Sequence, residues 1–140
     1  MNWLKAFVSG FLATLMFHQA VVALFWAIGL ISAAPFNLSP TQPFGVPAVV
    51  SLAFWGGLWG VPLWWLVRRW TGFHRVVGAT LAGALAPTAV AMLVVFPLKG
   101  LDISVTTVAG GLLINGAWGA GVVVFMALLR ARDLSSQSGS

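Results

Sequence analysis

The residues of this sequence that could do chemistry inside a membrane are one histidine and a few uncharged polar side chains. His18 and Gln19 lie near the middle of a long apolar segment, and Thr88 and Asn115 lie near the middle of two others. An ionisable residue inside a membrane is costly and by default indicates a function, and histidine can change its charge near neutral pH. We therefore predict a candidate polar site at the membrane midplane, formed by His18, Gln19, Thr88 and Asn115.

The same side chains also have a simpler interpretation. Polar residues on transmembrane helices commonly form interhelical hydrogen bonds, worth about 0.6 kcal/mol each on average. A site that moves an ion or a proton usually adds an acidic or a second ionisable partner, but Asp102 and Asp133 both lie outside the apolar segments. We favour the structural role for His18, Gln19 and Asn115 and keep the midplane site as the alternative.

The sequence lacks the residues needed for a metal site or an enzyme active site. The sequence has no cysteine, and its second histidine, His74, lies in a basic loop far along the chain from His18. A structural or catalytic metal needs three or four such ligands. Neither a carboxylate pair nor a nucleophile with an adjacent base can be identified. We expect no metal, no cofactor and no enzymatic activity.

The composition is that of a membrane protein. Hydrophobic residues make up 60% of the chain, charged residues 6%, and the mean hydropathy is +1.00, whereas soluble domains carry about 25% charged residues. Helices rather than strands are expected, because open sheet edges are not tolerated in lipid. Four apolar segments reach the length of about 20 residues that a transmembrane helix needs: residues 3–31, 47–67, 76–96 and 105–129.

The sequence therefore predicts an all-α fold, an integral membrane bundle of four transmembrane helices. The bundle occupies residues 1–134 as one domain, and the Ser, Gly and Gln residues at 135–140 predict a disordered cytoplasmic tail. Between the first two helices, the prolines and polar residues of 34–46 cannot continue a helix and predict an extended outer loop.

The basic residues predict how the chain is oriented. Six of the seven fall on one side of the predicted bundle: Lys5, Arg68, Arg69, Arg75, Arg130 and Arg132. The other side carries Lys99, with Asp102 three residues later. The positive-inside rule then places both termini in the cytoplasm. Trp64, Trp65 and Trp70 are expected to form an aromatic belt at the same membrane edge.

The net charge of +5 needs no nucleic-acid partner, because it serves as an insertion signal. A second expected use is contact with the headgroups of anionic phospholipids in the lipid bilayer. The residues expected to make that contact are Arg68, Arg69, Arg75, Arg130 and Arg132.

Small residues recur about every fourth position on each predicted helix. Such stripes let two helix backbones approach closely, which is how helices associate where lipid removes the hydrophobic driving force. The glycines expected to face inward and pack are Gly10, Gly56, Gly60, Gly83, Gly111 and Gly119.

An internal repeat is suggested by the second and fourth helices. The sequence Gly-Leu-Trp-Gly at 57–60 is echoed by Gly-Ala-Trp-Gly at 116–119, and each apolar run that follows ends in arginine. The first and third helices match more faintly: residues 18–21 align with 87–90, and Gly29-Leu30 with Gly100-Leu101. The hypothesis is two duplicated helical hairpins in parallel orientation; the alternative is chance recurrence in a chain rich in Gly and Trp.

Four short motifs resemble those of a group of small, uncharacterised bacterial inner-membrane proteins with four predicted helices. The motifs are His18-Gln19, Pro-Phe-Gly-Val-Pro at 43–47, Trp-Gly-Gly-Leu-Trp-Gly at 55–60 and Asn-Gly-Ala-Trp-Gly at 115–119. The resemblance covers most of the chain outside the tail. It implies a bacterial plasma membrane and brings no activity with it.

Two classes of function follow from these patterns. The first is a non-catalytic accessory or assembly subunit that packs through its Gly-rich helix faces, in a homo-oligomer or a larger membrane complex. The second is a small oligomeric transporter or channel with His18, Gln19 and Asn115 lining a midplane site. We favour the first class, because the polar residues lack a charged partner inside the membrane.

Overall fold

The computed structural model describes the backbone of residues 2–137 and the side chains of residues 2–132. Within that part of the chain, four helical spans are long and apolar enough to cross a membrane, which confirms the predicted all-α membrane bundle. The first span consists of α1 (Trp3–Ala13), the π-helix η1 (Thr14–His18) and α2 (Gln19–Ala27), and the second is α3 (Ala48–Val67). The third consists of α4 (Gly72–Val90), the π-helix η2 (Ala91–Val95) and α5 (Phe96–Leu98), and the fourth is α6 (Val105–Gln137).

The outer loop predicted at 34–46 contains a small antiparallel pair of strands, β1 (Pro40–Thr41) and β2 (Val46–Pro47). At the other end of the chain, α6 continues to Gln137. The predicted tail at 135–140 therefore falls partly on the end of this helix. Residues 138–140 lie outside the described residues, and their disorder stays a prediction.

The π-helices change which side chains face inward in the first span. A π-turn accommodates one residue more than an α-turn, so the helix beyond it is rotated by about 100° relative to an unbroken α-helix. Before η1 the buried residues include Ala6 and Gly10, and after it the buried polar residue is Gln19, whereas His18 is half-buried. An unbroken four-residue spacing from Ala6 through Gly10 and Thr14 would lead to His18, but the buried side of this span continues to Gln19 instead.

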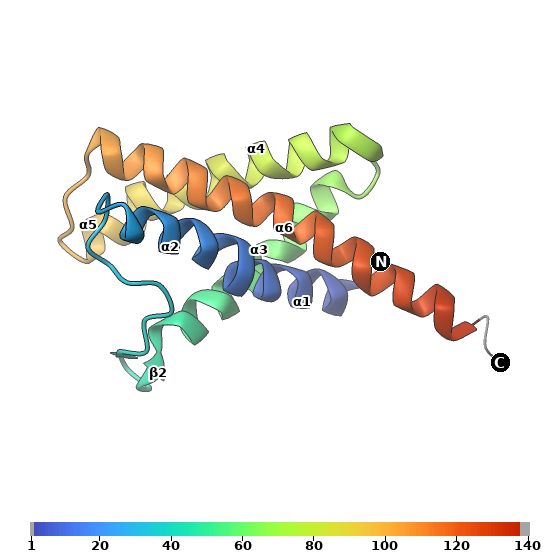
Figure 1. Cartoon of the computed structure of the whole chain (residues 1–140), viewed down its shortest axis with the longest axis horizontal. Helices are drawn as coiled ribbons and strands as arrows, with labels where there is room; N and C mark the ends of the chain where they lie inside the picture. Colours follow the sequence, from blue (N-terminus) through green and yellow to red (C-terminus); the bar gives the residue numbers. More distant parts are fainter. Residues whose placement is uncertain (1, 138–140) are drawn as a thin grey trace.

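The spans associate as two helical hairpins. α1 packs on α3, and α4 packs on α6, while α3 and α4 touch much less. The two hairpins are joined mainly by α1 against α6. Figure 1 shows α6 running beside α4 on one side and over α1 and α2 on the other. The start of α1, the end of α6 and the α3–α4 connection lie at one end of the bundle, as expected for four antiparallel spans.

Glycine contacts fix both hairpins. A Cβ atom added to Gly60 of α3 would lie 2.6 Å from the carbonyl oxygen of Ala6 and 2.9 Å from the Cα of Gly10. In the second hairpin, a Cβ atom on Gly83 would lie 2.9 Å from the Cα of Gly119. Backbones come this close only where side chains are absent. Each hairpin therefore depends on glycine at these positions.

The remaining predicted packing glycines also face neighbouring helices. A Cβ atom on Gly56 would overlap the hydroxyl of Thr14, and one on Gly111 would lie 3.0 Å from the Cγ2 of Thr88. Together with Gly10, Gly60, Gly83 and Gly119, these residues pack within one chain.

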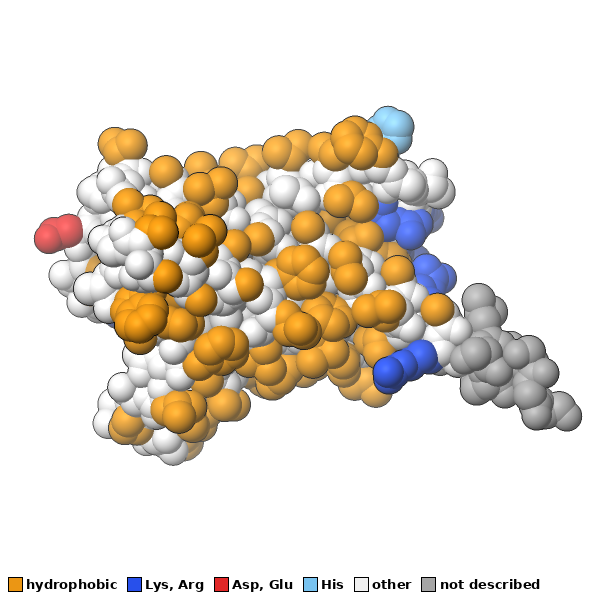
Figure 2. Space-filling view, viewed as in Figure 1, with side chains coloured by type: hydrophobic (Ala, Val, Ile, Leu, Met, Phe, Trp, Pro, Cys, Tyr) orange, Lys and Arg blue, Asp and Glu red, His pale blue; other side chains and the backbone are white. Residues whose placement is uncertain are grey.

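The buried core lies where α1, α3, α4 and α6 meet, and it includes Trp64 and Trp118, each only 3% exposed. The expectation that Trp64 belongs to an aromatic belt is therefore wrong, because its ring packs inside the bundle. Trp65 and Trp70 are exposed, as belt residues are. Apolar side chains cover much of the surface between the two ends of the bundle (Figure 2), which suits a surface that faces lipid.

Candidate functional site

Two of the four predicted midplane residues form a direct interhelical hydrogen bond. The Nδ2 of Asn115 on α6 donates to the Oγ1 of Thr88 on α4 over 2.9 Å. Thr88 is buried, and the absence of a side chain on Gly111 leaves space for its methyl group. This pair links the two helices of the second hairpin.

Gln19 makes a different contact, to the connection between α2 and α3. The backbone N–H of Phe36 donates to the Oε1 of Gln19 over 2.7 Å. Phe36 has a φ of +53°, a left-handed conformation that is unfavourable for a bulky side chain. Gln19 is therefore positioned to stabilise a strained turn of the loop that follows α2.

Among the described residues, His18 has only a marginal polar contact. Its Nδ1 lies 3.5 Å from the Nε2 of Gln19, at the limit of a hydrogen bond. No hydrogen bond found among the described residues joins His18 or Gln19 to Thr88 or Asn115. The structure thus places the predicted midplane residues in two pairs, one on the first span and one between α4 and α6.

A third polar contact was not predicted from the sequence. The carbonyl oxygen of Gly10 accepts a hydrogen bond from the indole Nε1 of Trp118 and another from the hydroxyl of Thr14, each over 3.0 Å. Trp118 lies on α6, so this contact joins the two hairpins. The sequence carries no signal for it, because the acceptor is a backbone carbonyl that any residue could supply.

The described residues contain no group of three or more His, Cys, Asp or Glu side chains that could hold a metal ion.

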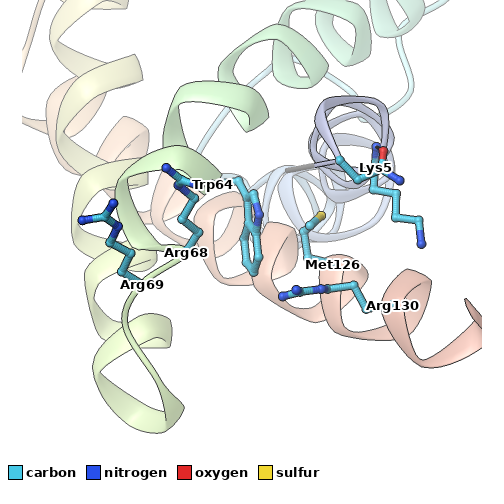
Figure 3. A pocket seen from close by; sticks show the side chains of 7 residues that line it. Lys5, Trp64, Arg68, Arg69, Met126 and Arg130 are labelled. Carbon is cyan, nitrogen blue, oxygen red and sulfur yellow. Dashed lines mark hydrogen bonds between the residues drawn. The ribbon is translucent and has the colours of Figure 1, made fainter. Parts of the chain in front are cut away.

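A concave feature lies at the end of the bundle that carries most of the basic residues. It is a cavity of about 510 Å³, here called the basic pocket. Its lining consists of Asn2, Lys5, Trp64, Arg68, Arg69, Met126 and Arg130. Figure 3 shows the Trp64 ring between the arginines at the end of α3 and the side chains of Met126 and Arg130, with Lys5 on the α1 side.

Trp64 and backbone carbonyls contact cations of the basic pocket and the neighbouring Arg75. The guanidinium carbons of Arg75 and Arg130 lie 5.3 and 5.7 Å from the Trp64 ring centroid, within the range of a cation–π interaction. The Nη2 of Arg75 also approaches the carbonyl oxygen of Arg68 at 3.4 Å, and the Nζ of Lys5 donates to the carbonyl oxygen of Leu129 over 3.0 Å.

Among the predicted lipid-contact arginines, Arg68, Arg69 and Arg130 line the basic pocket. Arg75 lies over Trp64, and Arg132 is exposed on α6 and is not part of the lining. Asp102 belongs to the connection between α5 and α6, at the end opposite the α3–α4 connection. Figure 2 shows blue basic side chains at one end of the bundle and a red acidic one at the other.

Comparison with protein-family models, curated proteins and solved structures finds no match for this chain. The similarity to small bacterial inner-membrane proteins therefore stays a resemblance of short motifs. The structure does show a small protein with four helices that are long and apolar enough to span a membrane.

Proposed function

We propose that this protein is a non-catalytic integral membrane protein that acts as an accessory or assembly subunit of a membrane complex. The observation that supports this proposal is that polar groups inside the bundle bond to one another. Asn115 donates to Thr88 and Trp118 donates to Gly10. A transport pathway instead needs polar groups that can bind the transported molecule, and it usually contains pairs of ionisable residues inside the membrane. Polar groups that already bond to one another fit a structural role better.

The glycine faces act within the protomer in this proposal. Gly10 contacts Gly60, and Gly83 contacts Gly119, inside a single chain. Partner contacts would then use the apolar outer surface of a preformed bundle. The third span, Gly72–Leu98, is the least buried of the four and leaves the most surface for lipid or for a partner.

The proposed location is the bacterial plasma membrane with both termini in the cytoplasm. Six of the seven Lys and Arg residues lie at the start of α1, on the α3–α4 connection and the first turn of α4, and near the end of α6. Such an excess of positive charge is typical of the cytoplasmic side of a membrane protein. At that surface the arginines would contact anionic phospholipid headgroups.

The two hairpins are also proposed to derive from a duplication. The Gly10–Gly60 contact has a counterpart in Gly83–Gly119, and each hairpin has a π-helix in its first span. The first span of each ends at a left-handed glycine, Gly29 with φ +75° and Gly100 with φ +63°. The residue after each glycine donates its N–H five residues back, to Phe25 and Phe96, as in a Schellman cap.

One observation keeps a small oligomeric transporter as the second candidate. His18 lies on η1, and single π-turns are frequent at functional sites. Its side chain is half-buried and has only the marginal contact to Gln19.

Native mass spectrometry of the protein released from its own membrane in a mild detergent tests the proposal. The expected result is a heterocomplex whose stoichiometry is the same for the wild type, His18→Gln and His18→Ala. A homo-oligomer that retains a small ligand, and loses that ligand but not its assembly in His18→Ala, would instead establish the transporter.

A further inference from the structure

The second and third spans start together but differ in length. α3 has 20 residues, and the span from Gly72 to Leu98 has 27. Both leave the short α3–α4 connection, so they begin at about the same level at the basic end of the bundle. Helices of these lengths extend about 30 and 40 Å, which are roughly the thickness of the hydrocarbon layer and that of a bilayer with its headgroups. The start of α3 therefore reaches only the edge of the hydrocarbon layer, whereas the α5–α6 connection reaches water.

The loop before α3 is fixed at the level of that helix start. We call residues 36–47, which contain β1 and β2, the β1–β2 loop. The backbone N–H groups of Ala48 and Val49 donate to the carbonyl oxygens of Ser39 and Asn37 over 3.0 and 2.9 Å. N–H groups in the first turn of a helix have no partner within the helix, so the loop supplies their acceptors. Figure 1 shows β2 at the start of α3, to one side of the bundle and short of the α5–α6 connection.

The distribution of charge agrees with these two levels. The connection from 28 to 47, which includes the β1–β2 loop, has no Asp, Glu, Lys, Arg or His in its sequence, whereas the much shorter α5–α6 connection has Lys99 and Asp102. Charged side chains are costly in the apolar part of a bilayer. A loop surrounded by water would have no reason to lack them over such a length.

The β1–β2 loop instead exposes large apolar side chains. Phe44 is 86% exposed, Leu38 71% and Phe36 52%. Phe44 belongs to the Pro-Phe-Gly-Val-Pro motif at 43–47, which has no role in the helix contacts. Phenylalanine and leucine are residues that interfacial segments bury at the boundary between headgroups and acyl chains.

Hydrogen bonds within the β1–β2 loop also suit a layer with little free water. The hydroxyl of Thr41 donates to the carbonyl oxygen of Val46 over 2.8 Å, and the N–H of Gly45 donates to the carbonyl oxygen of Thr41 over 2.7 Å. Backbone polar groups near hydrocarbon need such internal partners. The loop thus presents Phe44 from a backbone that is already hydrogen-bonded.

We propose that the β1–β2 loop is an interfacial membrane anchor. It lies in the headgroup layer at the end of the bundle opposite the basic residues, with the side chain of Phe44 at the boundary to the acyl chains. Its partner is the lipid surface rather than a protein, because the length of α3 places the loop at headgroup level. This inference requires that the four helices span a bilayer, and it is independent of the proposed accessory role.

The test uses spin labels on single cysteines, which is possible because the chain contains no cysteine. Phe44→Cys is compared with Asp102→Cys on the α5–α6 connection and with Leu85→Cys, at the middle of the third span and 62% exposed in the wild type. Each labelled protein is purified and placed in vesicles of dioleoyl phosphatidylcholine, and electron paramagnetic resonance measures how well oxygen and a water-soluble nickel chelate reach the label.

The Phe44 label should lie between the two references in depth. Its accessibility to the nickel chelate should be about threefold below that of the Asp102 label, because a polar chelate partitions poorly into the layer next to hydrocarbon. Its accessibility to oxygen should be below that of the Leu85 label. Equal exposure of the Phe44 and Asp102 labels to the chelate would place the loop in water and overturn the proposal.

A second pair of variants tests the Phe44 side chain itself. With the label moved to Gln42→Cys, which is exposed in the same loop, adding Phe44→Ser should raise accessibility to the nickel chelate towards that of the Asp102 label. Phe73→Ser is the matched control, because Phe73 is 77% exposed but lies on the first turn of α4, at the basic end. It should leave the label at position 42 unchanged. If Phe44→Ser also left it unchanged, Phe44 would not anchor the loop.

A protein partner would give a different result. The cysteine of Phe44→Cys would then react with a water-soluble maleimide in purified vesicles and be protected only in the protein's own membrane. That outcome would refute the lipid anchor. The accessory role is tested separately by the mass of the complex, so either idea can fail while the other holds.

Discussion

The α1–α3 hairpin and the α4–α6 hairpin share a close glycine contact but differ one helical turn away from it. In the first hairpin the residue one turn before Gly60 is Gly56, and in the second the residue one turn before Gly119 is Asn115. A Cβ atom on Gly83 would meet the carbonyl oxygen of Asn115 at 2.9 Å. The Asn115 side chain lies clear of this contact and bonds to Thr88.

This difference shows two ways to hold helices together in lipid. The first hairpin relies on backbone contact at both turns, and the second adds a side-chain hydrogen bond to a backbone contact. Where the backbones touch, a larger residue is tolerated only if its side chain leaves the contact and finds a polar partner.

The connections within the two hairpins differ as well. The first hairpin has a long connection, from Ile28 to Pro47, which contains β1 and β2 and is bonded to Gln19. The second has a short one, from Lys99 to Ser104. A long loop loses more conformational freedom when it is ordered, so a tether from the helix bundle matters in the first hairpin alone.

The largest expected effect comes from adding a methyl group at the glycine contacts. Gly60→Ala places Cβ 2.6 Å from the carbonyl oxygen of Ala6, and Gly119→Ala overlaps that of Ala79, so the backbones must separate. Each substitution should lower the free energy of unfolding by about 1–3 kcal/mol, measured by equilibrium unfolding in mixed micelles. Gly110→Ala is the control, because the nearest atom to its Cβ, on Phe25, is 3.9 Å away. Equal stability of all three variants would contradict the contacts.

A smaller and local effect is expected from Gln19→Leu. The substitution removes the acceptor of the Phe36 N–H, and a net hydrogen bond is worth about 0.5–1.5 kcal/mol. Amide hydrogen exchange should become faster in the connection between α2 and α3 and stay unchanged in the connection between α5 and α6. His18→Gln serves as the neighbouring control and should leave both connections unchanged. Unaltered exchange in Gln19→Leu would show that the loop does not depend on this tether.

The smallest expected effect concerns the side-chain bond that distinguishes the second hairpin. A double-mutant cycle of Thr88→Val and Asn115→Ala should give a coupling free energy of about 0.6 kcal/mol in unfolding measurements. In the first hairpin, the hydroxyl of Ser9 is buried without a hydrogen-bond partner among the described residues, so Ser9→Ala should cost no stability. A coupling free energy near zero would show that the hydrogen bond between Asn115 and Thr88 does not stabilise the second hairpin.

The four spans could be predicted from the sequence because hydropathy and length decide whether a helix crosses a membrane. The glycine stripes were also visible, since a four-residue spacing maps directly onto a helix face. Gly60 and Gly119 illustrate this: Gly60 follows Gly56 by four residues, and Gly119 follows Gly111 by eight.

Other contacts depend on geometry that residue types do not encode. The extra residue of η1 turns Gln19 inward in place of His18. The sequence Thr-Leu-Met-Phe-His does not predict a π-turn. Trp64 was predicted to be interfacial because Arg68 and Arg69 follow it, yet its ring is buried in the core, with Arg75 and Arg130 over it. The partner of Trp118 is a backbone carbonyl, which any residue at position 10 would present.

The π-turn η1 also bears on where this chain can change in length. Deleting one residue from an ordinary α-helix rotates everything beyond the deletion by about 100°, which would turn Gln19 or the glycine contacts out of the bundle. A deletion within Thr14–His18 has a milder consequence, because the π-turn can close to an α-turn and leave the residues on either side facing as before. The first span therefore carries, next to its buried Gln19, a segment in which the loss of one residue preserves the alignment of the rest.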